Sequence, residues 1–343
     1  PRHARPMRIA YLAEPDSGNG FYRGIGPMTA LEQCRGHSVR RLSTDEDRPP
    51  LADVRNVDVL HVHRYCDERA LRLIREAKAH GAALVWDNDD DITAVPKGTP
   101  AYRFFGGMQG ERRRAGMKRI FGVADLVTAP SRVLAERLRA AGAPRAEVIE
   151  NQLPDQFLKV DRRPHRGVTI GWIAGLEHQL DAERIPIRAT LQRLLDERED
   201  VNVVTFGLRL GLRSERYRAV DVVPLFELTQ EAAAFDIGIA PLADIDLSRA
   251  RSNIKLKEYA AAGAPWLASP IGPYAGMGEK QGGRLVADDG WHEQLTRLID
   301  KPRERRKLAK RATKWVAGET LTKHAADWEA KLAAAVERAR AAA

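Results

Sequence analysis

Short apolar runs alternate with amphipathic segments along the first half of the chain. The apolar runs have the length of buried strands, and they occupy residues 8–13, 57–63, 82–86, 126–129 and 148–150. The amphipathic segments have helical spacing, and they occupy the stretch around Met28 to Leu31 and residues 68–80, 111–123 and 131–142. Strands and helices in this order, with short connections, predict βαβ units and a parallel sheet.

The same alternation starts again after residue 167. Strand-like runs lie at residues 168–173, 201–206, 220–223, 236–241 and 265–268, and helix-like segments at 186–196, 229–234 and 252–262, before a helical tail. The stretch 151–167 between the halves carries Pro154, Pro164 and several charges without periodicity, which is typical of a linker. The pattern therefore predicts an α/β chain built of two halves.

The tail carries one apolar stripe. Its members recur mostly every three or four residues, and they are Trp315, Leu321, Ala325, Trp328, Leu332 and Val336. Such a stripe is typical of a helix that packs on a core. We expect this helix to clamp the two halves together.

Length and composition agree with a folded two-domain chain. The protein has 343 residues, of which 43% are hydrophobic and 30% charged, and this length corresponds to about two domains of ~150 residues. Cys34 and Cys66 are too few for a disulfide framework and lack zinc-site spacing. No apolar stretch approaches the ~18 residues of a membrane span, and no apolar leader follows the first basic residues. We expect a cytoplasmic protein.

The charge balance favours anionic partners. Lys and Arg number 56 against 47 Asp and Glu, a formal net charge of +9, which suits phosphates, nucleic acid or an acidic membrane surface. The densest basic cluster spans residues 301–314. A solvated helix face is favoured there over a membrane or polyanion patch.

A glycine-rich segment follows the first predicted strand. Gly18, Asn19, Gly20, Arg23 and Gly26 lie between this strand and the next helix, where bare amides can hold an anion. Neither a P-loop nor a dinucleotide-binding fingerprint is present, so an ordinary strand-to-helix turn is an equal alternative. The Arg23 guanidinium favours phosphate binding, because it can bind phosphate oxygens in bidentate fashion.

The strongest phosphate candidate begins the helix at 252–262. Ser252 can cap this helix and leave the amides of Asn253, Ile254 and Lys255 free, while the helix dipole and Lys255 add positive potential. Glu258 lies on the same side of the helix and could accept hydrogen bonds from ribose hydroxyls. The alternative is a capped surface helix with an intrahelical Lys-Glu pair.

Polar residues also follow strands of the first half. His61 and His63 share one face of a strand, with His63 nearer its carboxyl end, where open α/β sheets bind ligands. The acidic run 87–91 follows the next strand. It has three interpretations, which are a capping and solvated loop, an acceptor-binding or catalytic wall, and, least favoured, a divalent metal site.

These segments together resemble the GT-B glycosyltransferases, especially the retaining family-4-like group that uses nucleotide-sugars. The similar segments are DVLHVH (58–63), DIGIAPL (236–242), NIKLKEYAAAGAP (253–265) and GRLVAD (283–288) followed by Trp291. The resemblance implies two Rossmann-like domains facing across a cleft, with an acceptor domain at 7–155 and a donor domain at 166–314. It also implies that the helix within 315–343 crosses back to the first domain.

The resemblance further implies roles for single residues. Ser252, Asn253 and Lys255 would bind the diphosphate of the donor, Glu258 its ribose, and Gly18 to Gly20 would lie near the sugar and phosphates. Three positions depart from the family pattern. Ala250 stands where many relatives have a glutamate. Gly175, His178 and Asp181 stand where many relatives have Arg and Lys, and the run 87–91 stands where a histidine is often found.

We therefore expect an enzyme that transfers a sugar from a UDP- or GDP-sugar to an acceptor hydroxyl, with retention as the resemblance implies. Arg23 or His178, beside Gly175, would help to stabilise the departing diphosphate, and Asp89 and His63 are the candidate proton acceptors. We expect no cofactor or metal, and an unknown acceptor, with an anionic acceptor or a membrane surface among the candidates. The alternatives are a nucleotide-sugar 2-epimerase and a non-catalytic polyanion-binding protein.

Overall fold

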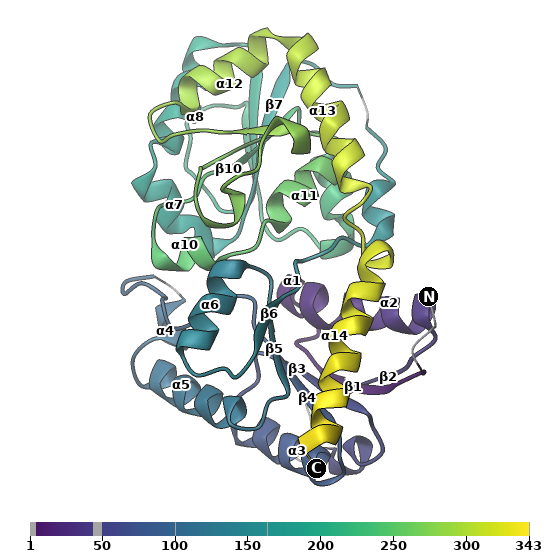
Figure 1. Ribbon diagram of the computed structural model, residues 1–343. Coiled ribbons are helices and arrows are strands. Elements are labelled where there is room, and N and C mark those ends of the chain that lie inside the picture. Colours follow the sequence, from purple (N-terminus) through teal and green to yellow (C-terminus); the bar gives the residue numbers. More distant parts are fainter. Residues whose placement is uncertain (1–4, 44–49, 100, 163, 343) are drawn as a thin grey trace.

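The computed structural model describes residues 5–43, 50–99, 101–162 and 164–342, which form two domains joined by two crossings of the chain (Figure 1). Each domain is built on a six-stranded, wholly parallel sheet. Helices cover the faces of both sheets, as parallel sheets require, because their strands are joined by crossover helices. The predicted α/β class is confirmed.

The first sheet has the strand order β2-β1-β3-β4-β5-β6. Its strands are β1 (Arg8–Leu12), β2 (Ser38–Arg41), β3 (Val59–His63), β4 (Ala83–Asp87), β5 (Leu126–Ala129) and β6 (Ala146–Val148). Its helices are α1 (Gly18–Gly20), a π-helical turn (Phe21–Ile25), α2 (Gly26–Arg35), the 3₁₀ turn Leu51–Val54, α3 (Glu68–Ala79), α4 (Tyr102–Phe105), α5 (Gly107–Phe121) and α6 (Arg132–Ala140).

The second sheet has the order β12-β11-β10-β7-β8-β9. Its strands are β7 (Val168–Ala174), β8 (Val201–Gly207), β9 (Tyr217–Val220), β10 (Ile237–Ala240), β11 (Trp266–Ala268) and β12 (Gly283–Leu285). Its helices are α7 (Gln179–Arg184), α8 (Ile187–Glu197), α9 (Leu228–Ala232), α10 (Asp246–Ala250), α11 (Ile254–Ala261), α12 (Trp291–Asp300) and α13 (Pro302–Val316). Single 3₁₀ turns lie at Asp155–Leu158, Leu176–His178, Leu225–Glu227, Gly272–Tyr274 and Glu279–Gln281.

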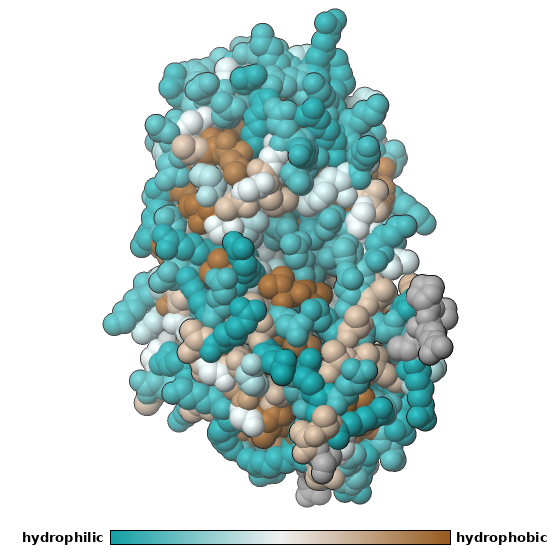
Figure 2. Space-filling view, in the orientation of Figure 1, coloured by the Kyte–Doolittle hydropathy of each residue, from teal (hydrophilic) through white to brown (hydrophobic). Residues whose placement is uncertain are grey.

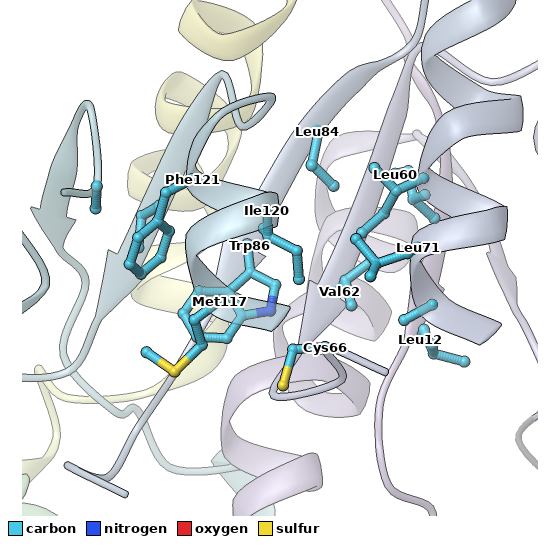
Figure 3. Close-up of a cluster of buried hydrophobic side chains, with 14 of the residues drawn as sticks. Leu12, Leu60, Val62, Cys66, Leu71, Leu84, Trp86, Met117, Ile120 and Phe121 are labelled. Carbon is cyan, nitrogen blue, oxygen red and sulfur yellow. The ribbon is translucent and has the colours of Figure 1, made fainter. Parts of the chain in front are cut away.

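The core of the first domain lies on both faces of its sheet. On one face, Met117, Ile120 and Phe121 of α5 pack over Trp86 of β4, whose ring meets the Phe121 ring edge to face (Figure 3). On the other face lie α2 and the last helix, α14 (Leu321–Ala342), which runs beside the first domain although it follows the second in sequence (Figure 1).

The predicted tail stripe is divided between two helices. Trp315 belongs to α13 and packs within the second domain, whereas Leu321, Ala325, Trp328, Leu332 and Val336 are buried positions of α14. The helix is interrupted between Val316 and Leu321, where the chain crosses between the domains. The prediction of one helix for the whole stripe was therefore wrong, while its packing against the first domain is observed.

Two predicted strands are displaced. The strand expected at 148–150 is Ala146–Val148, and the strand expected at 220–223 is Tyr217–Val220. In the second case the Tyr217 hydroxyl accepts a hydrogen bond from the Leu210 amide (2.8 Å), which fixes the strand earlier than the valines suggest. Val222 is left 89% exposed.

The surface shown in Figure 2 is mainly hydrophilic. Among the residues that the structure describes, no helix combines the length and apolar character that crossing a membrane needs.

Candidate functional site

A cavity of about 520 Å³ lies between the domains. Residues that follow β3 and β4 of the first sheet, such as Arg64 and Asp89, form one wall, and residues at the carboxyl ends of β7 and β8, such as Gly175 and Gly207, form the other. The carboxyl ends of both sheets therefore face this cavity, the position at which open α/β sheets bind ligands.

The amino end of α11 opens onto the cavity. Ser252, Ile254 and Lys255 line it, and the amides in the first turn of a helix have no acceptor within that helix. The helix dipole adds partial positive charge at the same place. This end of α11 thus offers N–H donors and positive potential to an anion in the cavity.

The cap of α11 differs from the prediction. The capping position is Asn253 rather than Ser252, and neither side chain caps the helix. The Ser252 hydroxyl accepts a hydrogen bond from Asn151 Nδ2 (3.1 Å) instead. Asn253 turns its side chain to Glu150 (Nδ2 to Oε2, 3.1 Å) and does not line the cavity, so the predicted contact of Asn253 with a diphosphate does not fit this structure.

Lys255 and Glu258 form an ion pair on the cavity wall. Lys255 Nζ lies 3.2 Å from Glu258 Oε2, and Glu258 Oε1 accepts a hydrogen bond from the Tyr22 hydroxyl of the first domain (2.8 Å). Burial and the adjacent Glu258 carboxylate raise the pKa of Tyr22 well above its ordinary value, so this hydroxyl remains a donor. The intrahelical pair expected as the alternative is present, yet both residues face the cavity.

Arg251 is a cavity residue that the sequence analysis missed. Its Nη2 donates to the Glu177 carbonyl (3.1 Å), and its Nη1 lies 3.1 Å from His178 Nε2. His178 Nδ1 in turn lies 2.7 Å from Asp181 Oδ2. Burial and the positive charge of Arg251 lower the pKa of His178, which favours the neutral ring that can accept from Arg251. Arg251 could have been predicted from its position directly before Ser252, where the helix expected to bind phosphate begins.

The second-domain wall becomes apolar beyond Gly175 and Gly207. Five residues near Gly207 and after β9 supply apolar side chains, and they are Phe206, Val222, Val223, Leu225 and Leu228. The cavity therefore joins charged residues to an apolar part on the second domain, a composition that suits a ligand with a flat organic group and an anionic group.

The glycine-rich segment forms helix rather than a loop. Gly18 begins α1, and the Ser17 side chain accepts from the Gly20 amide (3.0 Å), so the cap of this helix is a protein group. Gly18 and Asn19 line the cavity, as expected. Gly20 does not, because it packs on the Glu14 carbonyl so closely that a Cβ would lie 2.0 Å from that oxygen. The predicted contact of Gly20 with a donor is replaced by a packing role.

Arg23 is likewise a structural residue. Its side chain is fully buried and forms a bidentate pair with Asp87 (3.0 and 2.6 Å), and its Nη1 also donates to Asn151 Oδ1 (3.0 Å). The guanidinium lies 5.2 Å from the centre of the Trp328 ring. Because these partners occupy it and it does not line the cavity, the prediction that Arg23 binds phosphate was wrong.

The acidic run divides into two groups. Asp87 and Asp91 are structural, because Asp87 pairs with Arg23 and Asp91 accepts from Thr93 and pairs with Arg137. Asp89 and Asp90 line the cavity, and both pair with Arg64. The interpretation as a capping and solvated loop does not describe Asp87 and Asp91, which are buried and paired, and only Asp89 and Asp90 remain candidates for an acceptor wall.

The two cavity carboxyl groups differ electrostatically. Burial by itself would raise the pKa of Asp89, but Arg64 and the His63 ring, whose Nε2 lies 3.1 Å from Oδ1, bring it well below its ordinary value. Burial and the neighbouring Asp89 charge raise the pKa of Asp90, despite the opposing charge of Arg64. Asp90 is therefore the better proton acceptor of the two.

His63 lies behind this wall rather than in it. Its side chain is buried against Asp89 and does not line the cavity. His63 can therefore position Asp89, but it does not reach a ligand in the cavity. Arg64, the next residue, lines the cavity and has a strained backbone. Its φ of 63° is rare for a residue other than glycine, and such strain is common at functional sites.

Within the described ranges, no three His, Cys, Asp or Glu side chains come together as ligands of a metal ion would. The carboxylates of the acidic run are each engaged by the cations or hydroxyls named above.

Comparison of the whole fold finds solved structures that are similar to it. A structure of Anabaena Alr3699/HepE in complex with UDP and glucose superposes with a TM-score of 0.66 at 14% identity, over 95% of this chain and 99% of that one. An alpha-glucosyltransferase in complex with UDP-glucose and DNA containing an abasic site gives 0.65 at 11% identity, over 96% and 99%. A putative UDP-N-acetylglucosamine 2-epimerase from Listeria monocytogenes gives 0.54 at 13% identity, over 94% of each chain.

No protein-family model matches the sequence, and no curated protein matches it either. The structural likeness extends over nearly the whole chain, 95% of it against the HepE structure and 96% of it against the alpha-glucosyltransferase. The protein therefore has the GT-B fold, as the resemblance implied.

Proposed function

We propose that the protein is a glycosyltransferase that transfers a sugar from a UDP-sugar to an acceptor hydroxyl. The observation that carries this proposal is the amino end of α11, where Ile254 and Lys255 of the first turn and the neighbouring Arg251 line one cavity between the domains. The structural neighbours bound to UDP or UDP-glucose support a uridine donor over a guanosine one.

The cavity suggests an orientation for the donor. The diphosphate would lie at the amino end of α11, the ribose beside Glu258, and the base between the apolar residues around Val222 and Leu225. The sugar would then point to the first domain, toward Asn19 and Asp89. Glu258 has one oxygen held by Tyr22 and one by Lys255, so ribose binding would compete with Lys255 and release its ammonium toward the phosphates.

Leaving-group stabilisation would supply most of the rate enhancement. As the bond from the sugar to the diphosphate breaks, negative charge grows on the phosphate oxygen, where the amides, Lys255 and Arg251 are already oriented. The contacts of Arg251 with His178 and Glu177 would hold its guanidinium in place at little entropic cost. Asp90 would accept the proton of the acceptor hydroxyl, and the ionised Asp89 would orient that hydroxyl.

Lys255→Ala tests the proposal. We expect UDP to raise the melting temperature of the wild type more than GDP does, because bound ligand stabilises the native state. Removing an ammonium that contacts phosphate should weaken UDP binding by roughly ten- to a hundredfold. Isothermal titration calorimetry measures this, and Lys314→Ala, which removes an exposed lysine of α13, is the control. Equal UDP affinity in both variants would refute the placement of the diphosphate.

A nucleotide-sugar 2-epimerase is the second candidate. It is supported by the Listeria neighbour and by acid-base groups of different pKa, Asp89 and Asp90, in one cavity. An epimerase would convert the UDP-sugar without any acceptor, whereas a transferase would release UDP in step with a glycosylated product. Chromatography of the sugar nucleotides after incubation without acceptor distinguishes the two.

A further inference from the structure

We infer that the acceptor is a hydroxyl compound with an apolar body, aliphatic or aromatic, rather than a saccharide. This inference rests on the proposed function and concerns the part of the cavity that the donor would leave open. The structure gives that part a distinct composition.

The wall beyond the acidic pair is apolar. Ile92, Val95, Ala101 and Phe105 line it from the segment that follows β4, and Leu247 of α10 lines it from the second domain. A saccharide carries hydroxyl groups on every side, and each one buried without a hydrogen-bond partner costs free energy. These five side chains offer no such partner, whereas they would gain from covering apolar surface.

The polar and apolar parts of this wall are directly adjacent. Asp90 and Ile92 both line the cavity two residues apart, and the Ile92 amide donates to the Asp90 carbonyl (2.9 Å) in a tight turn that keeps them together. A hydroxyl at the Asp90 carboxylate would therefore place the rest of its molecule against Ile92 and Val95. This is the arrangement that an alcohol with a single reactive polar end requires.

The apolar wall is held in position from both domains. The Arg113 guanidinium lies 4.8 Å from the centre of the Phe105 ring and fixes that ring. Arg137 bridges the domains, with Nη1 2.7 Å from Asp91 Oδ2 and Nη2 3.0 Å from Asp246 Oδ1, which keeps α10 and its Leu247 against the first domain. The wall is thus a formed surface and not a chance contact of loose side chains.

Val95 gives the sharpest test of this wall. The UDP-sugar that most raises the melting temperature is offered with 1-octanol, 2-phenylethanol or glucose as acceptor, and UDP release and product are measured. We expect both alcohols to exceed glucose in kcat/KM. Val95→Ser should lower kcat/KM for the two alcohols by roughly tenfold while leaving the affinity for UDP unchanged. Val95→Leu should have the wild-type kcat/KM for the two alcohols, because the leucine side chain is apolar like valine.

Val123→Ser is the matched control, because Val123 is a partly exposed valine after α5 and does not line the cavity. It should behave as the wild type with all three acceptors. Glucose used as well as the alcohols, UDP binding without transfer to either alcohol, or a Val95→Ser variant equal to Val123→Ser would each overturn the inference and leave the proposed function intact. Failure of UDP to bind the wild type would overturn both.

Discussion

His61 is a buried histidine without a hydrogen-bond partner for either ring nitrogen among the described residues. Its ring meets the Trp328 ring edge to face at 5.8 Å. Burial lowers the pKa of His61 to about 4, with the nearby Asp87 charge opposing and the His63 and Arg23 charges adding to the shift. The ring is therefore neutral in the folded protein at neutral pH.

This pKa has a consequence for stability. The unfolded state takes up a proton on His61 as the pH falls below about 6.5, while the folded state does so only near 4. Unfolding is therefore favoured progressively across that interval, by up to roughly 3 kcal/mol. His61→Leu should unfold at the same or higher urea concentration than the wild type at pH 7, and its advantage should grow at pH 5.5 and 4.5.

The control for this prediction is His80→Leu, which changes an exposed histidine at the end of α3. Its urea midpoint should follow that of the wild type at all three pH values. A constant difference between His61→Leu and the wild type across this range would contradict the prediction.

Single residues also show how far sequence reasoning extends. Lys255, Glu258 and His178 were predicted because a local pattern, the start of a helix or the end of a strand, fixes where they lie. Arg23 has an equally suggestive local pattern, yet its partners Asp87 and Asn151 are 64 and 128 residues away in sequence. No local periodicity reports such contacts, and the same reason hid Arg251, whose contacts His178 and Glu177 precede it by more than 70 residues.

At the scale of one element, α14 is the most informative. Its buried positions Trp328, Leu332 and Val336 pack with Ile9 and Val85 of the first sheet, so this helix completes the core of a domain that begins more than 300 residues earlier in sequence. Apolar spacing predicted this helix and its contact. It did not predict the interruption after Val316, because Trp315 of α13 fits the apolar spacing of the stripe that continues in α14.

Trp328→Ala should destabilise the protein strongly. Trp328 is 1% exposed, and truncating such a large buried side chain leaves a cavity that costs about 3–5 kcal/mol. The urea midpoint of the variant, followed by circular dichroism, should fall well below that of the wild type. Lys323→Ala on the exposed face of the same helix should change it little. A shift as small as that of the control would show that α14 contributes little to this core.

At the scale of the whole molecule, one buried lysine connects the two segments that pass between the domains. Lys257 of α11 is fully buried, and its ammonium contacts Glu150 (3.0 Å), the Asn151 carbonyl (2.8 Å) and Glu319 (2.7 Å). Glu150 and Glu319 belong to the two segments by which the chain passes between the domains. These segments also pair with each other, with the Leu153 amide donating to the Glu319 carbonyl (3.0 Å).

Lys257→Met should therefore uncouple the domains. The substitution keeps the apolar stem but removes the donor to the Asn151 carbonyl and the counter-charge of the partly exposed Glu319 and Glu150, which costs about 1–3 kcal/mol. Scanning calorimetry should show a lower melting temperature and a broader transition, or one that splits in two. Lys310→Met on the exposed face of α13 is the control. A single unshifted transition in Lys257→Met would contradict this role.

The two-domain architecture followed from the sequence, while the relation between the domains did not. Repeated strand-helix spacing identifies each sheet, because every element of a sheet lies in one continuous half of the chain. The cavity depends on contacts across the halves, such as Tyr22 with Glu258 and Arg137 with Asp246, and residue spacing carries no information about them.

The position of α14 on the first sheet constrains how the protein is made. During synthesis the first domain leaves the ribosome with one face of its sheet covered by α2 but not yet by α14, and it remains so until residues 321–342 have followed the second domain out of the exit tunnel. Ile9, Val59 and Val85 would lack their contacts with Trp328, Leu332 and Val336 for that whole interval. The nascent first domain would thus keep apolar surface in water, and slow translation of the second half should increase aggregation.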